Sequence, residues 1–170
     1  MNKTGKYPCA ERFEEQINLL IKHKLAYLRS ISYRIVNNYD DADDAVQAAL
    51  VKAWNKQHSF RGEVPLSGWV ARIVITESYD VLRKRMRENR KIAVIEPSES
   101  NSESDNLRKL DKIVAELPEL YREAVHIGIY SRLDGESAAR ELGCSANTLY
   151  QRIHKAKQLI KAEFEKYEDL

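Results

Sequence analysis

Cysteine is scarce in this chain, and long apolar runs are absent. Cys9 and Cys144 lie far apart, and neither belongs to a CxxC or Cys/His cluster, so no disulfide framework or zinc site is indicated. The four histidines are equally scattered, which argues against another metal site. No window approaches the run of about 20 apolar residues that crosses a bilayer, and the N-terminus lacks a signal-peptide core. The sequence therefore predicts a cytoplasmic protein with no cofactor.

An excess of charge of one sign is also missing. With 28 Lys and Arg against 26 Asp and Glu, the formal net charge is only +2. Any affinity for nucleic acid must therefore come from local clusters of cations. The hydrophobic fraction of 43% and the charged fraction of 32% are typical of a helix-rich protein. A length of 170 residues allows one ordinary domain or two small ones.

Helical periodicity organises the first part of the chain. Residues 11–36 predict one long helix, or two that meet near 22–24, with an inward face of Phe13, Ile17, Leu20, Ile21, Leu28, Ile31 and Ile35. The next helix begins near Asp41, and Asp40 or Asp41 is expected to cap it. Its unbroken apolar stripe consists of Ala42, Ala45, Val46, Ala49, Leu50, Ala53 and Trp54.

A loop with Gly62 and Pro65 separates this helix from a third one, which begins near Leu66. The expected core-facing residues of the third helix are Leu66, Trp69, Val70, Ile73, Val81 and Leu82. The helix ends in RKRMRENRK at 83–91, with six basic side chains and one acidic one. Because a helix dipole favours only one or two cations there, so dense a cluster indicates binding to the phosphates of DNA.

The composition changes at 96–106, which reads EPSESNSESDN and has no large apolar residue. Such a segment is typical of a flexible linker. It divides the chain into an N-terminal domain at 1–95 and a C-terminal domain at 107–170. The fold class is therefore all-α, with two small helical domains joined by this linker.

Four helices are predicted in the C-terminal domain. They span 107–117, 119–130 (apolar face Leu120, Ala124, Val125, Ile127 and Ile129), 134–142, and from Ser145 to about 167. In the last helix, Leu149, Ile153, Ala156 and Ile160 face inward. Gly143 ends the short third helix, Ser145 caps the longer fourth one, and Cys144 is expected to be a small buried residue. This arrangement is the helix-turn-helix pattern, whose second helix enters the major groove of DNA.

The residues quoted so far resemble one family. Sigma factors of the extracytoplasmic-function (ECF) type dock on bacterial RNA polymerase with a segment that resembles DADDAVQAALVKAW at 41–54. FRGEVPLSGWVARIVITESYDVLRKRMR at 60–87 resembles their promoter-melting segment. ELPELYREAV and ELGCSANTLYQRIHKAKQLI resemble sigma region four, so that the resemblance covers nearly the whole chain.

The resemblance implies a dissociable promoter-specificity subunit that binds core polymerase, recognises the minus-ten and minus-thirty-five elements, and nucleates DNA melting. It implies no catalytic residue and no metal. The core-polymerase-binding residues would be Asp41, Asp43, Asp44, Gln47 and Lys52. The minus-ten residues would be Phe60, Arg61, Gly62, Glu63, Ser67, Arg72, Thr76, Asp80, Arg83, Lys84 and Arg87. The minus-thirty-five residues would be Asn147, Thr148, Tyr150, Gln151, Arg152, His154, Lys155 and Lys157.

The implied partners are the clamp helices of the largest polymerase subunit, the flap of the second-largest subunit, promoter DNA, and an anti-sigma or other recruiting factor. Several positions depart from the family pattern, Ala48 and Tyr150 among them. Ala48 stands where Glu is frequent, so a different balance of docking contacts is expected. Tyr150 stands where Arg is common, which removes a candidate for bidentate recognition of guanine.

Two other classes of function fit parts of the sequence. Asp40, Asp41 and Asp44 satisfy the DDxxD pattern of magnesium-dependent isoprenoid synthases, but the chain is short for such an enzyme and lacks a second acidic motif. A stand-alone helix-turn-helix regulator would explain the C-terminal helices. It would leave the acidic helix and the 60–67 loop without a role.

Overall fold

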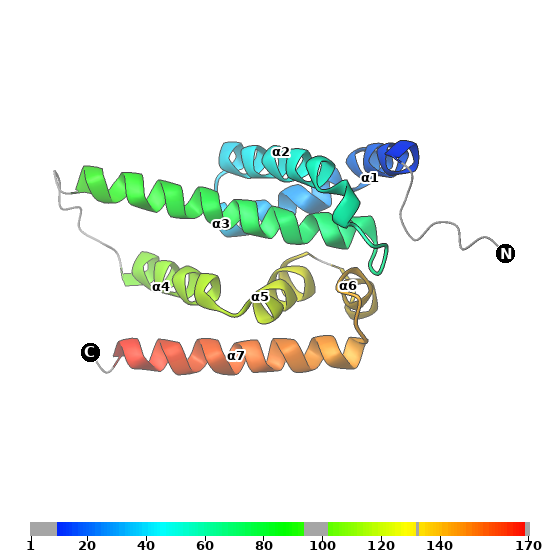
Figure 1. Cartoon of the computed structure of the whole chain (residues 1–170). Coiled ribbons are helices and arrows are strands. Elements are labelled where there is room, and N and C mark those ends of the chain that lie inside the picture. Colours follow the sequence, from blue (N-terminus) through cyan, green and yellow to red (C-terminus); the bar gives the residue numbers. More distant parts are fainter. Residues whose placement is uncertain (1–9, 94–101, 132, 169–170) are drawn as a thin grey trace.

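The computed structural model describes residues 10–93, 102–131 and 133–168, which form helices and short connections without a strand. Helices α1 (Ala10–Val36), α2 (Tyr39–Asn55) and α3 (Leu66–Ala93) form the N-terminal half, with the short 3-10 helix η1 (Gln57–Ser59) after α2. In Figure 1 this half lies above the helices of the C-terminal half, and α3 faces them.

The described residues of the C-terminal half form four α-helices. They are α4 (Ser102–Glu116), α5 (Glu119–Val125), α6 (Gly135–Glu141) and α7 (Ala146–Glu168). A π-helix, η2 (His126–Tyr130), continues α5. The segment from Ser102 to Asn106 is helical, although the sequence predicted it as part of the linker. The remaining linker positions, 96–101, lie outside the described residues.

The α1–α2 turn differs from the predicted one. Asn37 has a positive φ of 51°, and Asn38 is extended and accepts a 3.0 Å hydrogen bond from the Asp41 amide. Asn38 is therefore the N-cap of α2, in place of the predicted Asp40 or Asp41. Asn37 tolerates the left-handed backbone conformation, so α1 can end there and Asn38 can cap α2.

The inward face of α1 follows the predicted pattern in one continuous helix. Phe13, Leu28 and Ile31 are completely buried. Ile21 is 37% exposed, contrary to the prediction, because it neighbours the buried Leu20 in sequence and lies about 100° around the helix from it. In α2 the stripe from Ala42 to Ala53 is buried or half-buried, and Trp54 at its end is 41% exposed.

Helix α3 is buried on two sides. The predicted residue Val70 is buried, and the other predicted core residues of α3 pack partly buried against the core. The structure also buries Ala71, Val74, Ile75, Ser78 and Tyr79, which the sequence did not single out. One side of α3 meets α1 and α2, and the other meets the C-terminal half.

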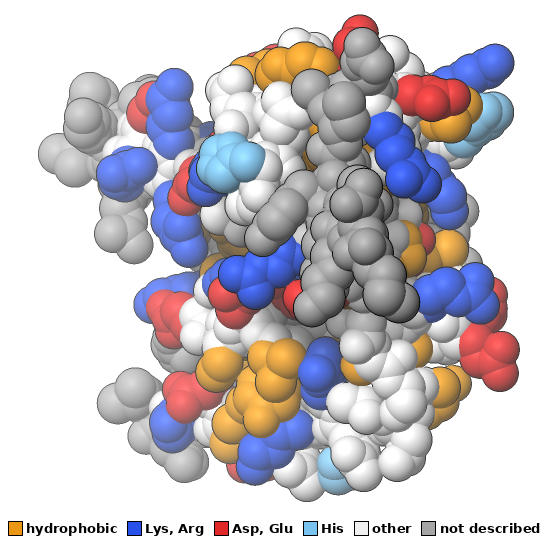
Figure 2. Space-filling view, turned by 45° about the vertical axis from the view of Figure 1, so that its right-hand side comes forward, with side chains coloured by type: hydrophobic (Ala, Val, Ile, Leu, Met, Phe, Trp, Pro, Cys, Tyr) orange, Lys and Arg blue, Asp and Glu red, His pale blue; other side chains and the backbone are white. Residues whose placement is uncertain are grey.

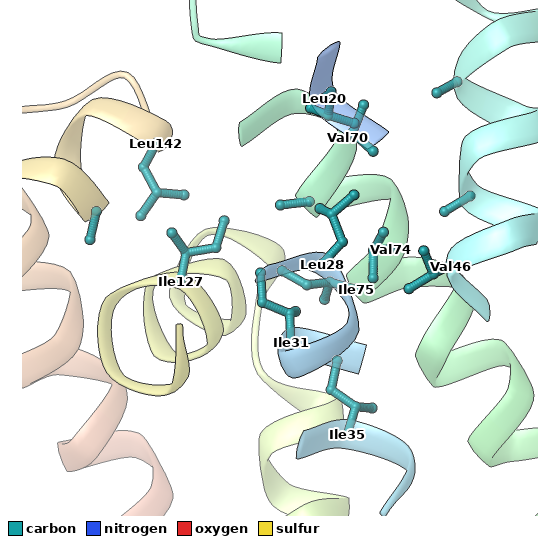
Figure 3. Close-up of a cluster of buried hydrophobic side chains, with 14 of the residues drawn as sticks. Leu20, Leu28, Ile31, Ile35, Val46, Val70, Val74, Ile75, Ile127 and Leu142 are labelled. Atoms are coloured by element: carbon teal, nitrogen blue, oxygen red, sulfur yellow. The ribbon is translucent and has the colours of Figure 1, made fainter. Parts of the chain in front are cut away.

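The two halves share one hydrophobic core. Figure 3 shows Ile31 of α1 and Ile75 of α3 beside Ile127 of η2 and Leu142, which follows α6. A second, smaller cluster lies within the C-terminal half and contains Val114, Leu117, Val125 and Ala156. The sequence predicted two helical domains but not this common core between them.

The apolar face predicted for 119–130 is wrong at both ends. Leu120 is 44% exposed and Ile129 is 43% exposed, whereas the consecutive residues Glu123 to Ile127 are buried. The π-helix accounts for Ile129, since a wider turn shifts the positions in and after it relative to a 3.6-residue period. The predicted α7 face is confirmed, with Leu149 and Ala156 buried.

Candidate functional site

The docking residues predicted on α2 differ in whether they form ion pairs with other helices of the chain. Asp41 accepts a 2.7 Å bond from Arg85, and Asp43 pairs with Arg29 at 2.7 Å. Lys52 pairs with Glu77, and this hydrogen bond raises the pKa of Lys52. These three predicted residues therefore tie α2 to α1 and α3.

Asp44 and Gln47, the other two predicted docking residues, are exposed. Val51 follows them on the same side of α2, four residues after Gln47, and is 62% exposed. The sequence analysis missed Val51, although its position outside the apolar stripe was a signal. An exposed acid, amide and aliphatic side chain in one row resemble the mixed composition of protein interfaces.

The loop at 61–65 presents polar groups above an aromatic cluster. Arg61, Gly62 and Glu63 are exposed, and Gly62 has a positive φ of 69°. Phe60 was predicted to bind DNA, but it is only 6% exposed and its ring lies 5.3 Å from Trp69. Phe60 therefore anchors the loop in the core instead of offering a free aromatic face.

Two further residues predicted to bind the minus-ten element, Ser67 and Arg72, lie at the boundary between the halves, and a third, Thr76, lies one turn after Arg72 on α3. The Ser67 hydroxyl is 2.7 Å from both carboxylate oxygens of Glu141. Arg72 donates to Glu123 at 3.1 Å and to the carbonyl of Leu142 at 3.1 Å. Thr76 donates to the Arg72 carbonyl within α3.

These contacts place carboxylates in a region that is shielded from water. Burial raises the pKa of Glu123, and the nearby Arg72 guanidinium opposes that shift. Glu141 is 8% exposed. A buried carboxylate is costly unless it is paired, so each of these acids depends on its partner in α3.

The basic end of α3 remains open to solvent where its side chains are described. Arg83, Lys84 and Arg87 are exposed, although Arg83 forms a local pair with Asp80 at 2.7 Å. Arg85 instead bonds Asp41 and the Val36 carbonyl and so fastens α3 to the α1–α2 turn. The exposed cations can contact a polyanion without any rearrangement.

Replacing Arg83, Lys84 and Arg87 with Ala is expected to weaken promoter binding equally on all sequences. Contacts with phosphates release counterions, so the log-log dependence of affinity on salt should fall by roughly one unit per lost contact. Promoter binding by the polymerase complex would be measured from low to moderate salt. An unchanged salt slope with an altered minus-ten preference would contradict this prediction and indicate base recognition.

Helix α7 presents most of its predicted residues outward. Asn147, Gln151, His154, Lys155 and Lys157 are exposed. Two others, Thr148 and Arg152, are half-buried, while Tyr150 is 60% exposed. The Ser145 hydroxyl accepts from the Thr148 amide at 3.1 Å, which confirms the predicted cap.

The turn before α7 is tightly packed. Gly143 has a positive φ of 64°, and Asp134 caps α6 by accepting from the Glu136 and Ser137 amides. Cys144 is half-buried, not fully buried as predicted, because it lies at the edge of this turn. Helix α6, the turn and α7 thus form a helix-turn-helix unit with the outer face of α7 free.

A buried histidine also lies at the boundary between the halves. His126 of η2 is 2% exposed, and its Nε2 forms a 2.7 Å hydrogen bond with the Tyr79 hydroxyl of α3. Burial lowers the pKa of His126 from 6.5 to about 3, and the Arg122 guanidinium adds to this shift. The other charged or titratable side chains that line the small cavity beside the ring are Arg34, Asp111 and Tyr130.

The lowered pKa predicts loss of stability in acid. Between about pH 6.5 and 3 the unfolded chain binds a proton at His126 that the folded chain does not bind. The contribution of His126 to the free energy of unfolding is therefore complete above about pH 6.5 and declines below it. The expected slope is about 1.4 kcal/mol per pH unit. Urea unfolding of the native protein and His126→Phe would be compared from pH 7 to 4. Parallel stability curves for the two proteins would contradict the assignment.

The described part of the chain contains neither a cluster of metal ligands nor a membrane-spanning helix. No group of three or more His, Cys, Asp or Glu side chains there is arranged to hold a metal ion. Among the helices that the structure describes, none combines the length and apolar character needed to cross a membrane.

Comparisons with known proteins match both halves of the chain. Residues 20–88 match the family model for Sigma-70 region 2, and residues 107–160 match the model for Sigma-70, region 4. The RNA polymerase sigma factor SigV of Bacillus subtilis is 27% identical over 160 residues, covering 91% of this chain and 93% of SigV. The ECF RNA polymerase sigma-E factor of Escherichia coli is 29% identical over 167 residues, covering 86% of this chain and 85% of that protein.

A solved structure also aligns with the fold. It is the sigma factor RpoE of Bartonella quintana in complex with the anti-sigma factor NepR. RpoE is 28% identical, with a TM-score of 0.49, and the alignment covers 90% of this chain and 96% of RpoE.

Proposed function

The chain belongs to the sigma-70 family as a sigma factor of the ECF type, and we propose how its surfaces divide the work of promoter-specific transcription initiation. A sigma factor binds core RNA polymerase and promoter DNA. This conclusion rests on the matches to region 2 and region 4, which follow each other along the chain. Together the two matches cover more than half of its length.

Docking on core polymerase is assigned to the exposed row Asp44, Gln47 and Val51 of α2. The row is open in the structure, and it combines charge with an apolar side chain. Asp41, Asp43 and Lys52 support it by holding α2 against its neighbours. The proposed partner surfaces are the clamp helices of the largest subunit and the flap of the second-largest subunit, the flap being assigned to the C-terminal half.

Recognition of the minus-ten element is assigned to the loop at 61–65 and the adjoining part of α3. The exposed Arg61 and Glu63 flank a glycine whose conformation shapes the loop. A protein that melts DNA must hold an unstacked base, and the loop offers polar groups for this task. The basic end of α3 supplies sequence-independent contacts with phosphates.

Recognition of the minus-thirty-five element is assigned to the outer face of α7. Its exposed amides and cations, Gln151 and Lys155 among them, are suited to base edges and phosphates in the major groove. Figure 2 shows cationic and anionic side chains intermixed on the face in view, without one extended field of positive charge. This distribution favours local contacts over bulk attraction to DNA.

The role of the family is non-catalytic, and we infer that this chain has no enzymatic activity and acts in the cytoplasm, where its polymerase partner is found. An anti-sigma factor or another recruiting factor completes the proposed set of partners. No observation favours the alternative of a stand-alone helix-turn-helix regulator.

Co-purification with core polymerase, followed by transcription from promoter libraries randomised separately in each element, tests the proposal. We expect a stable complex and a distinct preference in each library. Tight binding of duplex DNA by the free protein, without association with polymerase, would instead indicate a stand-alone regulator.

A further inference from the structure

The outer face of α7 carries amide and aromatic side chains in its first turns. With about 100° of rotation per residue, Asn147, Gln151 and His154 fall on one stripe that spans about 60° of the helix surface. All three side chains are exposed. Tyr150 lies on one flank of this stripe, about 60° from Asn147, and Lys155 lies on the other flank, about 80° from it. The centre of the face therefore consists of two amides and an imidazole.

The single arginine of α7 points away from this face. Arg152 lies about 140° around the helix from Asn147 and is half-buried. Burial raises the pKa of Glu123 on α5, and the nearby charges of Arg72 and Arg152 oppose that shift. The Arg152 guanidinium thus lies on the side of α7 that packs against α5. All residues at 146–158 are described, and no arginine among them is exposed.

Tyr150 packs against the helix that precedes α7. A Cβ atom placed on Gly135, the first residue of α6, would lie 2.5 Å from the Tyr150 hydroxyl oxygen. The glycine therefore leaves room for the hydroxyl beside the backbone of α6, which stands next to the beginning of α7 in Figure 1. Tyr150 is nevertheless 60% exposed. Because its hydroxyl end is turned towards α6, the part that faces outward is chiefly the ring.

These side chains have distinct preferences for bases in the major groove. Amide side chains form bidentate hydrogen bonds with the N6 and N7 atoms of adenine, and apolar surfaces contact the 5-methyl group of thymine. Asn147 and Gln151 supply the amides, and the ring of Tyr150 supplies the apolar surface beside them. Lys155 and Lys157 lie on opposite flanks of the stripe, where they are placed for the phosphates on either side of the groove.

We propose that Tyr150 is a specificity-determining residue for the upstream promoter element, with its ring against the 5-methyl group of a thymine and with Asn147 and Gln151 hydrogen-bonded to adenines. The base pairs that face the first two turns of α7 are then A·T pairs, because no exposed guanidinium selects guanine there. This inference rests on the proposed assignment of α7 to the minus-thirty-five element. It adds the identity of the bases that the helix selects.

Selection from a promoter library tests which bases are preferred. The unmodified chain in complex with core polymerase would be offered promoters with a fixed minus-ten element and a randomised minus-thirty-five region. We expect adjacent A·T pairs to be enriched in the bound fraction. Tyr150→Arg should replace A·T by G·C at one of these positions, since a guanidinium pairs with guanine. Gln151→Ala should lower the preference for adenine at a neighbouring position by about 5-fold to 150-fold.

Deoxyuridine tests the contact of the Tyr150 ring separately, because it differs from thymidine only in lacking the 5-methyl group. It would replace thymidine at the position whose preference Tyr150→Arg alters. Burial of one methyl-sized group is worth about fourfold in affinity, so the unmodified complex should bind the substituted promoter about fourfold more weakly. Tyr150→Ala should bind both promoters equally. The matched control is Tyr39→Ala, which removes a tyrosine of α2 that is 76% exposed and should keep the fourfold difference.

Two results would overturn the proposal. One is enrichment of guanine, in place of A·T pairs, at the positions that the α7 variants alter. The other is equal binding of the thymidine and deoxyuridine promoters by the unmodified complex, since a preference for A·T would then arise from the shape of the DNA. Failure of the proposed function would appear differently, as absence of polymerase binding or as a bound fraction without preference at any upstream position.

Discussion

Asp44→Arg combined with Gln47→Ala is expected to weaken binding to core polymerase by roughly 30-fold or more. Both side chains are exposed on α2, so they contact neither the core nor the ion pairs that hold the helix. Reversing a charge within an interface typically costs at least about 2 kcal/mol, which corresponds to roughly a 30-fold increase in Kd. Biolayer interferometry with immobilised core polymerase would measure the change.

The matched control for this variant is Glu15→Arg with Asn18→Ala, which changes an exposed acid and an exposed amide on α1, outside the surfaces assigned to polymerase. Its affinity for core polymerase should change far less. Helical content should be the same in both variants, because neither pair is buried. If the α2 variant binds core polymerase with unaltered affinity, the exposed row of α2 is not the docking surface.

Phe13→Ala is expected to produce the largest loss of stability. Phe13 is completely buried, and its ring lies 6.2 Å from Trp54, 6.2 Å from Phe60 and 6.4 Å from Trp69. Truncation of a buried Phe typically costs about 3–5 kcal/mol through lost burial and the cavity that remains. For a chain of this size the loss corresponds to a decrease in Tm of roughly 10 °C.

Thermal unfolding followed by circular dichroism would measure the decrease in Tm. Leu19→Ala is the matched control, because Leu19 lies on the same helix and is 50% exposed. Its effect should stay within about 0.5 kcal/mol. Equal Tm values for the two variants would show that the aromatic cluster does not stabilise the fold as the structure indicates.

The same cluster connects stability to function. Phe60 precedes the loop at 61–65 directly, and its ring is held between Phe13 and Trp69. Loss of Phe13 should therefore loosen the loop assigned to the minus-ten element as well as α1. The resemblance alone had placed Phe60 among the DNA-binding residues, since its position in the motif does not reveal which way the ring points.

Helix positions and helix faces could be predicted largely from local sequence. The spacing of Phe13, Leu28 and Ile31 predicted the inward face of α1, and Ser145 predicted the start of α7. Such features depend on residues within one or two turns of each other, so a period of 3.6 residues is sufficient information. The motifs at 41–54 and 60–87 likewise identified the family, because they are contiguous in the chain.

Two local details of the backbone could not be predicted from hydrophobic periodicity. Asn38 caps α2 where Asp40 or Asp41 was expected, because the backbone of the preceding turn decided where the helix begins. The π-helix at 126–130 shifted the buried face and left Ile129 exposed. Each difference arises from geometry that hydrophobic periodicity does not contain.

The all-α class, the order of the two sigma regions and the residues of the proposed binding surfaces follow from the order of amino acids along the chain. Which of those residues are accessible depends on how the helices pack in three dimensions. Ser67 and Glu141 are 74 positions apart, and no local pattern relates them. Their contact depends on how two independently patterned halves pack, because the energy of a buried carboxylate is set by the partner that the fold brings to it.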